Sequence, residues 1–262
     1  MIKKFVNFLI QKLNKYKFYA LIMVYYPKIR NPIYLKYYLK KIQQVEKSSN
    51  LETMIDFTFV QKNLLDFLFL GKGVIYTKQI KSEILALLNT LKKKNPKTIL
   101  EIGTAGGGTL FLFSQVAHKD AILISIDLPE TVYGESYPKW KAHLYNTSVK
   151  PTQTLFLIKA NSHQTKTLRK IQHILGKNKL DLLFIDGDHS YKGVKQDFQM
   201  YAPLVKENGI IVFHDIVKVP DENMNVNKFW NEIKTEFNYK EIVDDWNQGK
   251  CGIGIIMKNK RK

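Results

Sequence analysis

Two apolar runs in the second half of the chain end in an acidic residue close to a histidine. The stretch "LFIDGDHSY" holds Asp186, Asp188 and His189, and "IIVFHD" ends in His214 and Asp215. Burying an unpaired charge is costly, so these residues are expected either to cap a helix or to take part in a reaction. Carboxylates bind hard cations, and a histidine exchanges its proton near neutral pH. The two stretches therefore predict a site for cation binding or proton transfer, with helix capping around Asp188 as the structural alternative.

A glycine-rich stretch follows an earlier apolar run. "ILEIGTAGGGT" carries Glu101, Gly103 and three consecutive glycines at 106–108, and Asp127 ends the next apolar run. In open α/β sheets such a loop lies where a nucleoside-containing cofactor meets the carboxyl edge. The dinucleotide fingerprint nearly fits, but Ala105 replaces its second glycine, which favours a cofactor without phosphates. A glycine-rich turn that serves packing alone is the alternative.

The elements that must position these residues follow from an alternation of apolar runs and helical patterns. Runs this continuously apolar are typical of parallel strands buried on both faces, and strands that alternate with helices form βαβ units. The sequence therefore predicts an α/β fold. The expected strands are 98–101, 121–127, 154–159, 180–186, 209–214, 239–243 and 252–257, and the expected helices are 79–91 and those near 109–118, 164–175, 191–205 and 226–237.

The net charge of +18 over 262 residues is concentrated at the start of the chain, where residues 1–50 hold eleven Lys or Arg against Glu46. Apolar residues recur there at helical spacing between lysines, which predicts a basic amphipathic helix. We expect a basic helical extension over 1–60 and one domain over 61–262. The extension could contact an anionic membrane through residues 1–50. The alternative is packing on its own domain or on a second subunit, as in a homo-oligomer. The apolar stripe consists of Ile2, Phe5, Val6, Leu9, Leu13, Tyr16 and Ala20.

Composition narrows the class of protein further. The basic charge is not organised into a nucleic-acid-binding module, so we expect no specific nucleic-acid partner. The only cysteine, Cys251, cannot form an intrachain disulfide, and the apolar stretch 18–26 is shorter than the roughly 20 residues that span a bilayer. We therefore expect a cytoplasmic protein without a transmembrane helix.

The glycine loop together with "ILISID" resembles the class I S-adenosylmethionine-dependent methyltransferases. The resemblance implies a Rossmann-like, seven-stranded, mostly parallel sheet whose last strand is antiparallel. It implies that the loop holds the methionine part of S-adenosylmethionine, that the acid after the second strand holds the ribose, and that residues after the third strand contact the adenine. The cofactor-binding residues would then be Glu101, Gly103, Thr104, Gly107, Asp127, Asn161 and Ser162.

"LLFIDGDHSYKGVKQDF" and "NGIIVFHD" are similar to one branch of these enzymes, which includes macrolide-sugar O-methyltransferases and cephalosporin hydroxylase-like proteins, over about residues 78–258. The resemblance implies that Asp186 and Asp215 hold Mg²⁺ or Mn²⁺ and that His189 is the general base. Ends of neighbouring strands lie about 5 Å apart, so the two aspartates could share one ion. Some members carry Glu where this chain has His214; if His214 coordinates as well, a softer metal becomes possible.

These inferences predict a divalent-metal-assisted O-methyltransferase that acts on a hydroxyl of a small-molecule or sugar-containing substrate. The alternatives are a metal-independent or N-directed methyltransferase, a non-catalytic cofactor-binding protein docked by its basic extension, and a nicotinamide-dependent reductase. A reductase would leave the acid and histidine pairs unexplained. Four aromatic residues between the second and third strands could stack on an acceptor or belong to the core: Tyr133, Tyr137, Trp140 and Tyr145.

Overall fold

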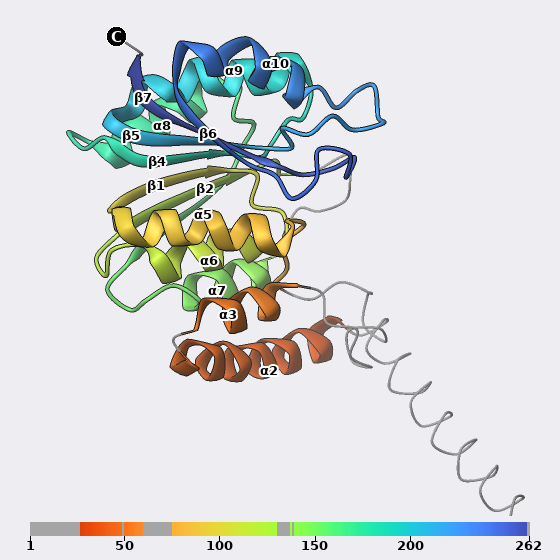
Figure 1. Cartoon of the computed structure of the whole chain (residues 1–262). Helices are drawn as coiled ribbons and strands as arrows, with labels where there is room; N and C mark the ends of the chain where they lie inside the picture. Colours follow the sequence, from red (N-terminus) through yellow and green to blue (C-terminus); the bar gives the residue numbers. More distant parts are fainter. Residues whose placement is uncertain (1–26, 49, 60–74, 130–136, 138, 261–262) are drawn as a thin grey trace, which may run out of the picture.

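The protein is built around one seven-stranded sheet (Figure 1). The computed structural model describes residues 27–48, 50–59, 75–129, 137 and 139–260. The strand order is β3-β2-β1-β4-β5-β7-β6, and β7 runs antiparallel to both of its neighbours. This arrangement confirms the predicted Rossmann-like methyltransferase fold. The strands are β1 (Thr98–Ile102), β2 (Ile122–Asp127), β3 (Thr154–Lys159), β4 (Leu180–Ile185), β5 (Val205–His214), β6 (Phe237–Ile242) and β7 (Ile253–Lys260).

Helices cover both faces of the sheet, and each face has its own apolar core. One face packs against α5 (Lys81–Lys94), α6 (Gly108–Val116) and α7 (Lys139–Thr147), with α2 (Pro27–Ser48) and α3 (Leu51–Thr58) outside them (Figure 1). The other face packs against α8 (Thr165–Leu175), α9 (Tyr191–Tyr201) and α10 (Val226–Ile233). Successive residues of a strand point to opposite faces, so the central strands must be apolar throughout.

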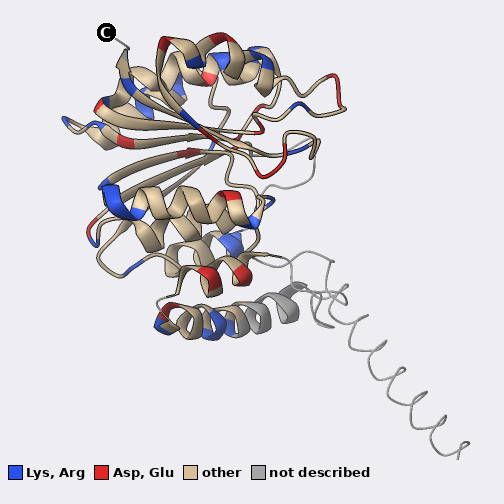
Figure 2. Ribbon diagram, viewed as in Figure 1, with Lys and Arg blue, Asp and Glu red and all other residues tan. Residues whose placement is uncertain are grey.

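Charged residues lie mainly on the helices and loops that surround this sheet, while the strands are uncharged over most of their length (Figure 2). All five residues of β1 are buried, which is the burial expected of a central parallel strand. The buried charge at the carboxyl end of the sheet is therefore an exception to the pattern, and it marks the part of the fold that packing alone does not explain.

Two predicted boundaries differ from the structure around β5. The predicted helix 191–205 ends at Tyr201 and continues as a 3₁₀ turn at Ala202–Leu204. The strand predicted from Gly209 begins at Val205, which pairs with Leu180 before the register shifts. The polar residues 206–208 resemble a turn in the sequence, but they form this irregularity inside the strand, and Asn208 has a φ of 61° there.

The described part of the N-terminal region packs on the domain. Tyr38 and Ile42 of α2 are buried in the same core as α5 and α6, together with Met54 and Ile55 of α3. The apolar stripe predicted from Ile2 to Ala20 lies outside the described residues. Among the helices that the structure describes, none combines the length and hydrophobicity that a membrane crossing requires.

Replacing Ile42 by Ala should lower the free energy of unfolding by about 2–4 kcal/mol, because the change removes a buried side chain and leaves a cavity between α2 and the domain. Lys40→Ala, at an exposed position of the same helix, should change it by less than about 0.5 kcal/mol. Urea unfolding of both variants measures the difference. Equal stability of the two would show that α2 contributes nothing to the core.

Candidate functional site

The carboxyl ends of β1 and β4 meet at the predicted site. The backbone N–H of Asp186 donates to the carbonyl of Ile102 at 2.9 Å. Gly103 has a φ of 99°, and a Cβ built on it would lie 2.1 Å from the carbonyl oxygen of Asp186. Only glycine fits this position without movement of the backbone. The glycine loop (residues 103–108) and the end of β4 are therefore one contiguous structure.

Two aspartates and two histidines form a compact cluster at the ends of β4 and β5, called here the Asp–His cluster: Asp186, His189, His214 and Asp215. Nδ1 of His189 lies 3.0 Å from Oδ2 of Asp215, and its Nε2 lies 3.4 Å from Oδ1 of Asp186. Nδ1 of His214 lies 3.0 Å from the same Oδ1 of Asp186 and 3.4 Å from Oδ1 of Asp215. The fold thus brings together all four residues that the sequence proposed for metal binding and proton transfer.

The four groups shift one another's proton affinity. Burial by itself would lower the pKa of His189, but its hydrogen bonds to Asp186 and Asp215 outweigh burial and raise that pKa to about 10. Burial likewise opposes the charge of His214, yet the two carboxylates hold its pKa well above the usual range. The histidines in turn keep the pKa of Asp215 below its ordinary value, although burial acts to raise it. In the chain alone, the cluster is two carboxylates balanced by two imidazolium ions.

The helix-capping alternative accounts for the residues beside His189 but not for His189 itself. Ser190 is the N-cap of α9, and its hydroxyl accepts a hydrogen bond from Gly193 N–H at 3.0 Å. The carboxylate of Asp188 accepts from Ser190 N–H at 2.9 Å, which closes the turn before the helix. These bonds leave the imidazole of His189 directed at the two aspartates. Asp188 is therefore a turn residue, while His189 belongs to the Asp–His cluster.

Asp127 is joined to the glycine loop from the end of β2. Its Oδ2 accepts from Ala105 N–H at 2.9 Å, and its Oδ1 accepts from Leu128 N–H at 2.8 Å. Gly107 has a φ of 72°, and a Cβ on it would lie 2.5 Å from the Tyr145 ring. The loop therefore needs glycine at this position both for its backbone and for its packing.

Glu101 lies in β1 beneath the loop and is fully buried. Its Oε2 accepts from the Ser125 hydroxyl at 2.5 Å, and the hydroxyl of Thr104 lies 2.6 Å from that of Ser125. Burial is the main reason that the pKa of Glu101 is well above its usual range, and it favours the protonated form of the carboxyl group. Within the described chain, its Oε1 is buried and has no hydrogen-bond partner.

Asn161 and Ser162 lie in the turn after β3 and are partly buried. The side chain of Asn161 accepts from His163 N–H at 2.8 Å, and the Ser162 carbonyl accepts from the Tyr201 hydroxyl at 2.7 Å. Both residues are thus fixed by the turn and by α9, at the same edge of the sheet as Asp127. Their contact with an adenine remains a prediction.

Two of the four aromatic residues predicted between the second and third strands belong to the core. Tyr137 and Tyr145 are buried and pack edge to face, with their ring centroids 5.3 Å apart. Tyr145 also lies against Gly107. Tyr133 and the side chain of Trp140 lie outside the described residues. The two buried rings pack behind the glycine loop. At these two positions the aromatic residues therefore belong to the core, the second of the two predicted roles.

Three residues that support the site were not identified from the sequence as site residues. Gln79, just before α5, donates to Oδ2 of Asp186 at 3.2 Å. Glu83 is buried in α5 and accepts from Gly252 N–H at 2.9 Å and from the Gln248 side chain at 2.8 Å. Cys251 donates its backbone N–H to Oδ1 of Asp215 at 2.9 Å. Gly249 and Gly252 signal a tight turn before the last strand, but nothing local signals the contact of Cys251 with Asp215.

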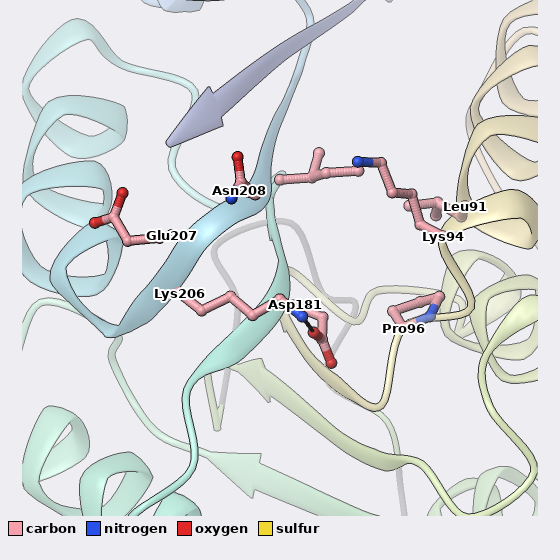
Figure 3. Close-up of a pocket in the computed structure, with 8 residues that line it drawn as sticks. Leu91, Lys94, Pro96, Asp181, Lys206, Glu207 and Asn208 are labelled. Atoms are coloured by element: carbon pink, nitrogen blue, oxygen red, sulfur yellow. Dashed lines mark ion pairs between the residues drawn. The ribbon is translucent and has the colours of Figure 1, made fainter. Parts of the chain in front are cut away.

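A cavity of about 320 Å³ lies at the amino ends of the parallel strands, near the starts of β4 and β5 (Figure 3). Its Asp181 accepts from the backbone N–H groups of Lys97 and Thr98 at 2.7 and 2.9 Å and pairs with Lys206. Asp181 therefore anchors the start of β1. The cavity is distant from the glycine loop and from the Asp–His cluster. Its lining residues are Leu91, Lys94, Pro96, Asp181, Lys206, Glu207, Asn208 and Ile210.

Residues 100–216, which include the glycine loop and the Asp–His cluster, match the family described as a methyltransferase domain. An uncharacterised protein of Acanthamoeba polyphaga mimivirus is 37% identical over 130 residues, which are 49% of this chain and 55% of that protein. An uncharacterised protein of Sinorhizobium fredii is 24% identical over 139 residues, 53% of this chain and 15% of that protein. The chain thus spans little more than half of the first of these curated relatives and a small part of the second.

Solved structures share the fold at low sequence identity. The O-methyltransferase TomG of Streptomyces achromogenes, in complex with SAM, has a TM-score of 0.50 and 17% identity, over 76% of this chain and 91% of that chain. An O-methyltransferase of Bacillus cereus, in complex with SAH, has a TM-score of 0.50 and 13% identity, over 84% of this chain and 90% of that chain. Residues 100–216 thus match the methyltransferase-domain family, and the chain shares the class I methyltransferase fold with these solved structures.

The raised pKa of Glu101 predicts a pH-dependent stability. Above the ordinary pKa of 4.5 the unfolded chain loses the proton and the folded chain keeps it, so stability falls as the pH rises toward the folded pKa. Glu101→Gln removes this titration. The melting temperature of the wild type should therefore fall between about pH 5 and pH 8 by roughly 3 °C or more beyond that of the variant.

Glu207→Gln is the control for this measurement, because Glu207 is exposed in β5. Its melting temperature should follow that of the wild type across the pH range. Parallel curves for the wild type and Glu101→Gln would show that the buried carboxyl group titrates normally.

Proposed function

We propose that the protein is an S-adenosylmethionine-dependent, divalent-metal-assisted O-methyltransferase that acts on a hydroxyl of a small-molecule or sugar-containing substrate. One observation carries the proposal: the glycine loop and the Asp–His cluster share a single edge of the sheet, joined through Gly103 and Asp186. A cofactor loop beside groups that bind cations and move protons is the arrangement that metal-assisted methyl transfer needs.

The residues around the glycine loop suit a cofactor that carries an ammonium group and a ribose but no phosphate. The buried Oε1 of Glu101 has no partner among the described residues and can accept a hydrogen bond from a cation. Asp127 stands at the position where an acid binds ribose hydroxyls in related folds. Ala105, where the dinucleotide fingerprint has its second glycine, argues against a nicotinamide dinucleotide.

The Asp–His cluster suits a divalent cation by its chemistry and its charge. Asp186 and Asp215 offer carboxylate oxygens, and one atom from each of Asp186, His189 and Asp215 lies within 4.8 Å of the others. In the chain alone, two imidazolium ions balance the two carboxylates. A single divalent cation supplies the same positive charge, so the histidines can release their protons when it binds.

His189 is the group we propose as general base. S-adenosylmethionine supplies an electrophilic methyl group, and a divalent cation supplies charge that lowers the pKa of an acceptor hydroxyl. With a pKa of about 10, His189 holds its proton in the chain alone. Positive charge beside Asp186 and Asp215 opposes the imidazolium and lowers this pKa toward neutrality. His189 can then take the hydroxyl proton at a ring nitrogen, while the glycine loop fixes the direction of attack.

Asp127→Ala should weaken S-adenosylmethionine binding by about 30-fold, the equivalent of about 2 kcal/mol for buried, charge-assisted hydrogen bonds. Calorimetry with S-adenosylmethionine measures the change. Asp120→Ala removes an exposed carboxylate before the opposite end of β2 and should leave the affinity within twofold of the wild type. Wild-type affinity in Asp127→Ala would remove this residue from the cofactor site, and tight NADH binding would contradict the proposed cofactor.

His189→Ala should lower methyl transfer by about 100-fold while S-adenosylmethionine affinity stays unchanged, because the base acts only on the acceptor. The assay uses labelled S-adenosylmethionine with a panel of catechols, phenols and sugar nucleotides. EDTA should abolish transfer by the wild type, and Mg²⁺ or Mn²⁺ should restore it. Asp186→Ala should remove both the activity and its response to metal.

His173→Ala is the matched control for His189→Ala, because His173 is exposed on α8. It should transfer methyl groups at the wild-type rate. Full activity of the wild type in EDTA would favour a metal-independent methyltransferase of the same fold. Full activity of His189→Ala would show that His189 is not the general base and that the turn before α9 has only a structural role.

A further inference from the structure

Cys251 lies against the Asp–His cluster from the turn that precedes β7. It is buried, its backbone N–H holds Asp215, and its sulfur lies 3.4 Å from the carbonyl oxygen of Lys78. Cys251 and Asp215 are both non-glycine residues in the left-handed region, with φ values of 58° and 61°. Such a conformation is disfavoured for these residues and persists where the surrounding structure imposes it, most often at functional sites. Here the two strained residues face each other.

Three different ligand types meet at this point. A ring nitrogen of His214, a carboxylate oxygen of Asp215 and the sulfur of Cys251 lie within 4.8 Å of one another, and all three residues are buried. His214 is 4% exposed, and its Nε2 finds no hydrogen-bond partner in the part of the chain that the structure describes. A buried imidazole nitrogen without a partner is costly unless a ligand completes its contacts. The group is thus more than an isolated thiol.

We infer that His214, Asp215 and Cys251 form a second set of metal ligands, which shares Asp215 with the set of Asp186 and His189 and selects a transition-metal ion such as Zn²⁺, Co²⁺ or Fe²⁺ over Mg²⁺. The inference rests on the proposed function, and it assigns to this second set an ion of another kind than the Mg²⁺ or Mn²⁺ proposed for Asp186 and Asp215. Thiolate and imidazole ligands favour these ions, whereas Mg²⁺ prefers oxygen ligands alone. Binding requires that the Cys251 thiol give its proton to solvent and leave its contact with Lys78.

The charges of the two sets support this assignment. One divalent ion balances the Cys251 thiolate and the Asp215 carboxylate, and His214 then coordinates as a neutral imidazole. Asp186 keeps the hydrogen bond from Gln79 and its 3.4 Å contact with His189, whose proton can leave as the proposed base requires.

The test is a Co²⁺ titration of the full chain, followed by absorption spectroscopy. Cys251 is the only cysteine of the sequence, so any thiolate-to-Co²⁺ charge-transfer band in the near ultraviolet comes from this residue. The wild type should show this band, and Zn²⁺ should displace it. Cys251→Ser should lose the band and bind Co²⁺ at least tenfold more weakly, while its Mn²⁺ affinity stays within twofold of the wild type.

His214→Gln is the second variant: it should weaken Co²⁺ binding at least tenfold and keep the sulfur band at saturation. A wild-type spectrum without a sulfur band at saturating Co²⁺ would overturn the inference even if no variant folds. Unchanged Co²⁺ affinity in Cys251→Ser would overturn it as well. Calorimetry with S-adenosylmethionine on the same samples separates this outcome from failure of the proposed function, because loss of cofactor binding and loss of the sulfur band are independent results.

Discussion

The structure of the site depends on the need to balance charge where two strands end. Asp186 and Asp215 follow neighbouring parallel strands, so their carboxylates are held close together at the edge of a sheet that is otherwise apolar. Neither charge can be buried alone. His189 and His214 supply the compensating charge, and their proton affinity is raised as a result. Any ligand that enters this cluster must replace that compensation, which is why a divalent cation suits it.

A second layer of contacts holds the cluster in place. Gln79 reaches Asp186 from the segment before α5, and Glu83 fixes the turn before β7 through backbone and side-chain donors. The same turn supplies the backbone N–H of Cys251, which donates to the carboxylate of Asp215. Residues at and just before the start of α5 and in the turn before β7 therefore cooperate in orienting the two carboxylates, although they lie far apart in the sequence.

The sequence was sufficient for the fold and for the members of the cluster. Continuous apolar runs mark buried strands, and the residues directly after them lie at one edge because parallel strands end together. The supporting contacts could not be predicted in this way. Glu83 has an ordinary helical position, and only the close approach of the turn before β7 makes it a hydrogen-bond acceptor. The bulge at 206–208 was missed because its polar residues have the composition of a turn.

The contact between Gly103 and Asp186 has a consequence for how the protein matures. These residues are brought together only when β1 pairs with β4, and Asp215 gains its backbone donor only when β7 has joined β5. Contacts between such distant segments form late in folding, because the chain must first close long loops. The β4–α9 unit already carries Asp186 and His189, but the backbone donor of Asp215 exists only in a chain whose sheet includes β7. Truncation before β7 therefore removes a support of the cluster that lies 36 residues further along the chain than the aspartate it holds.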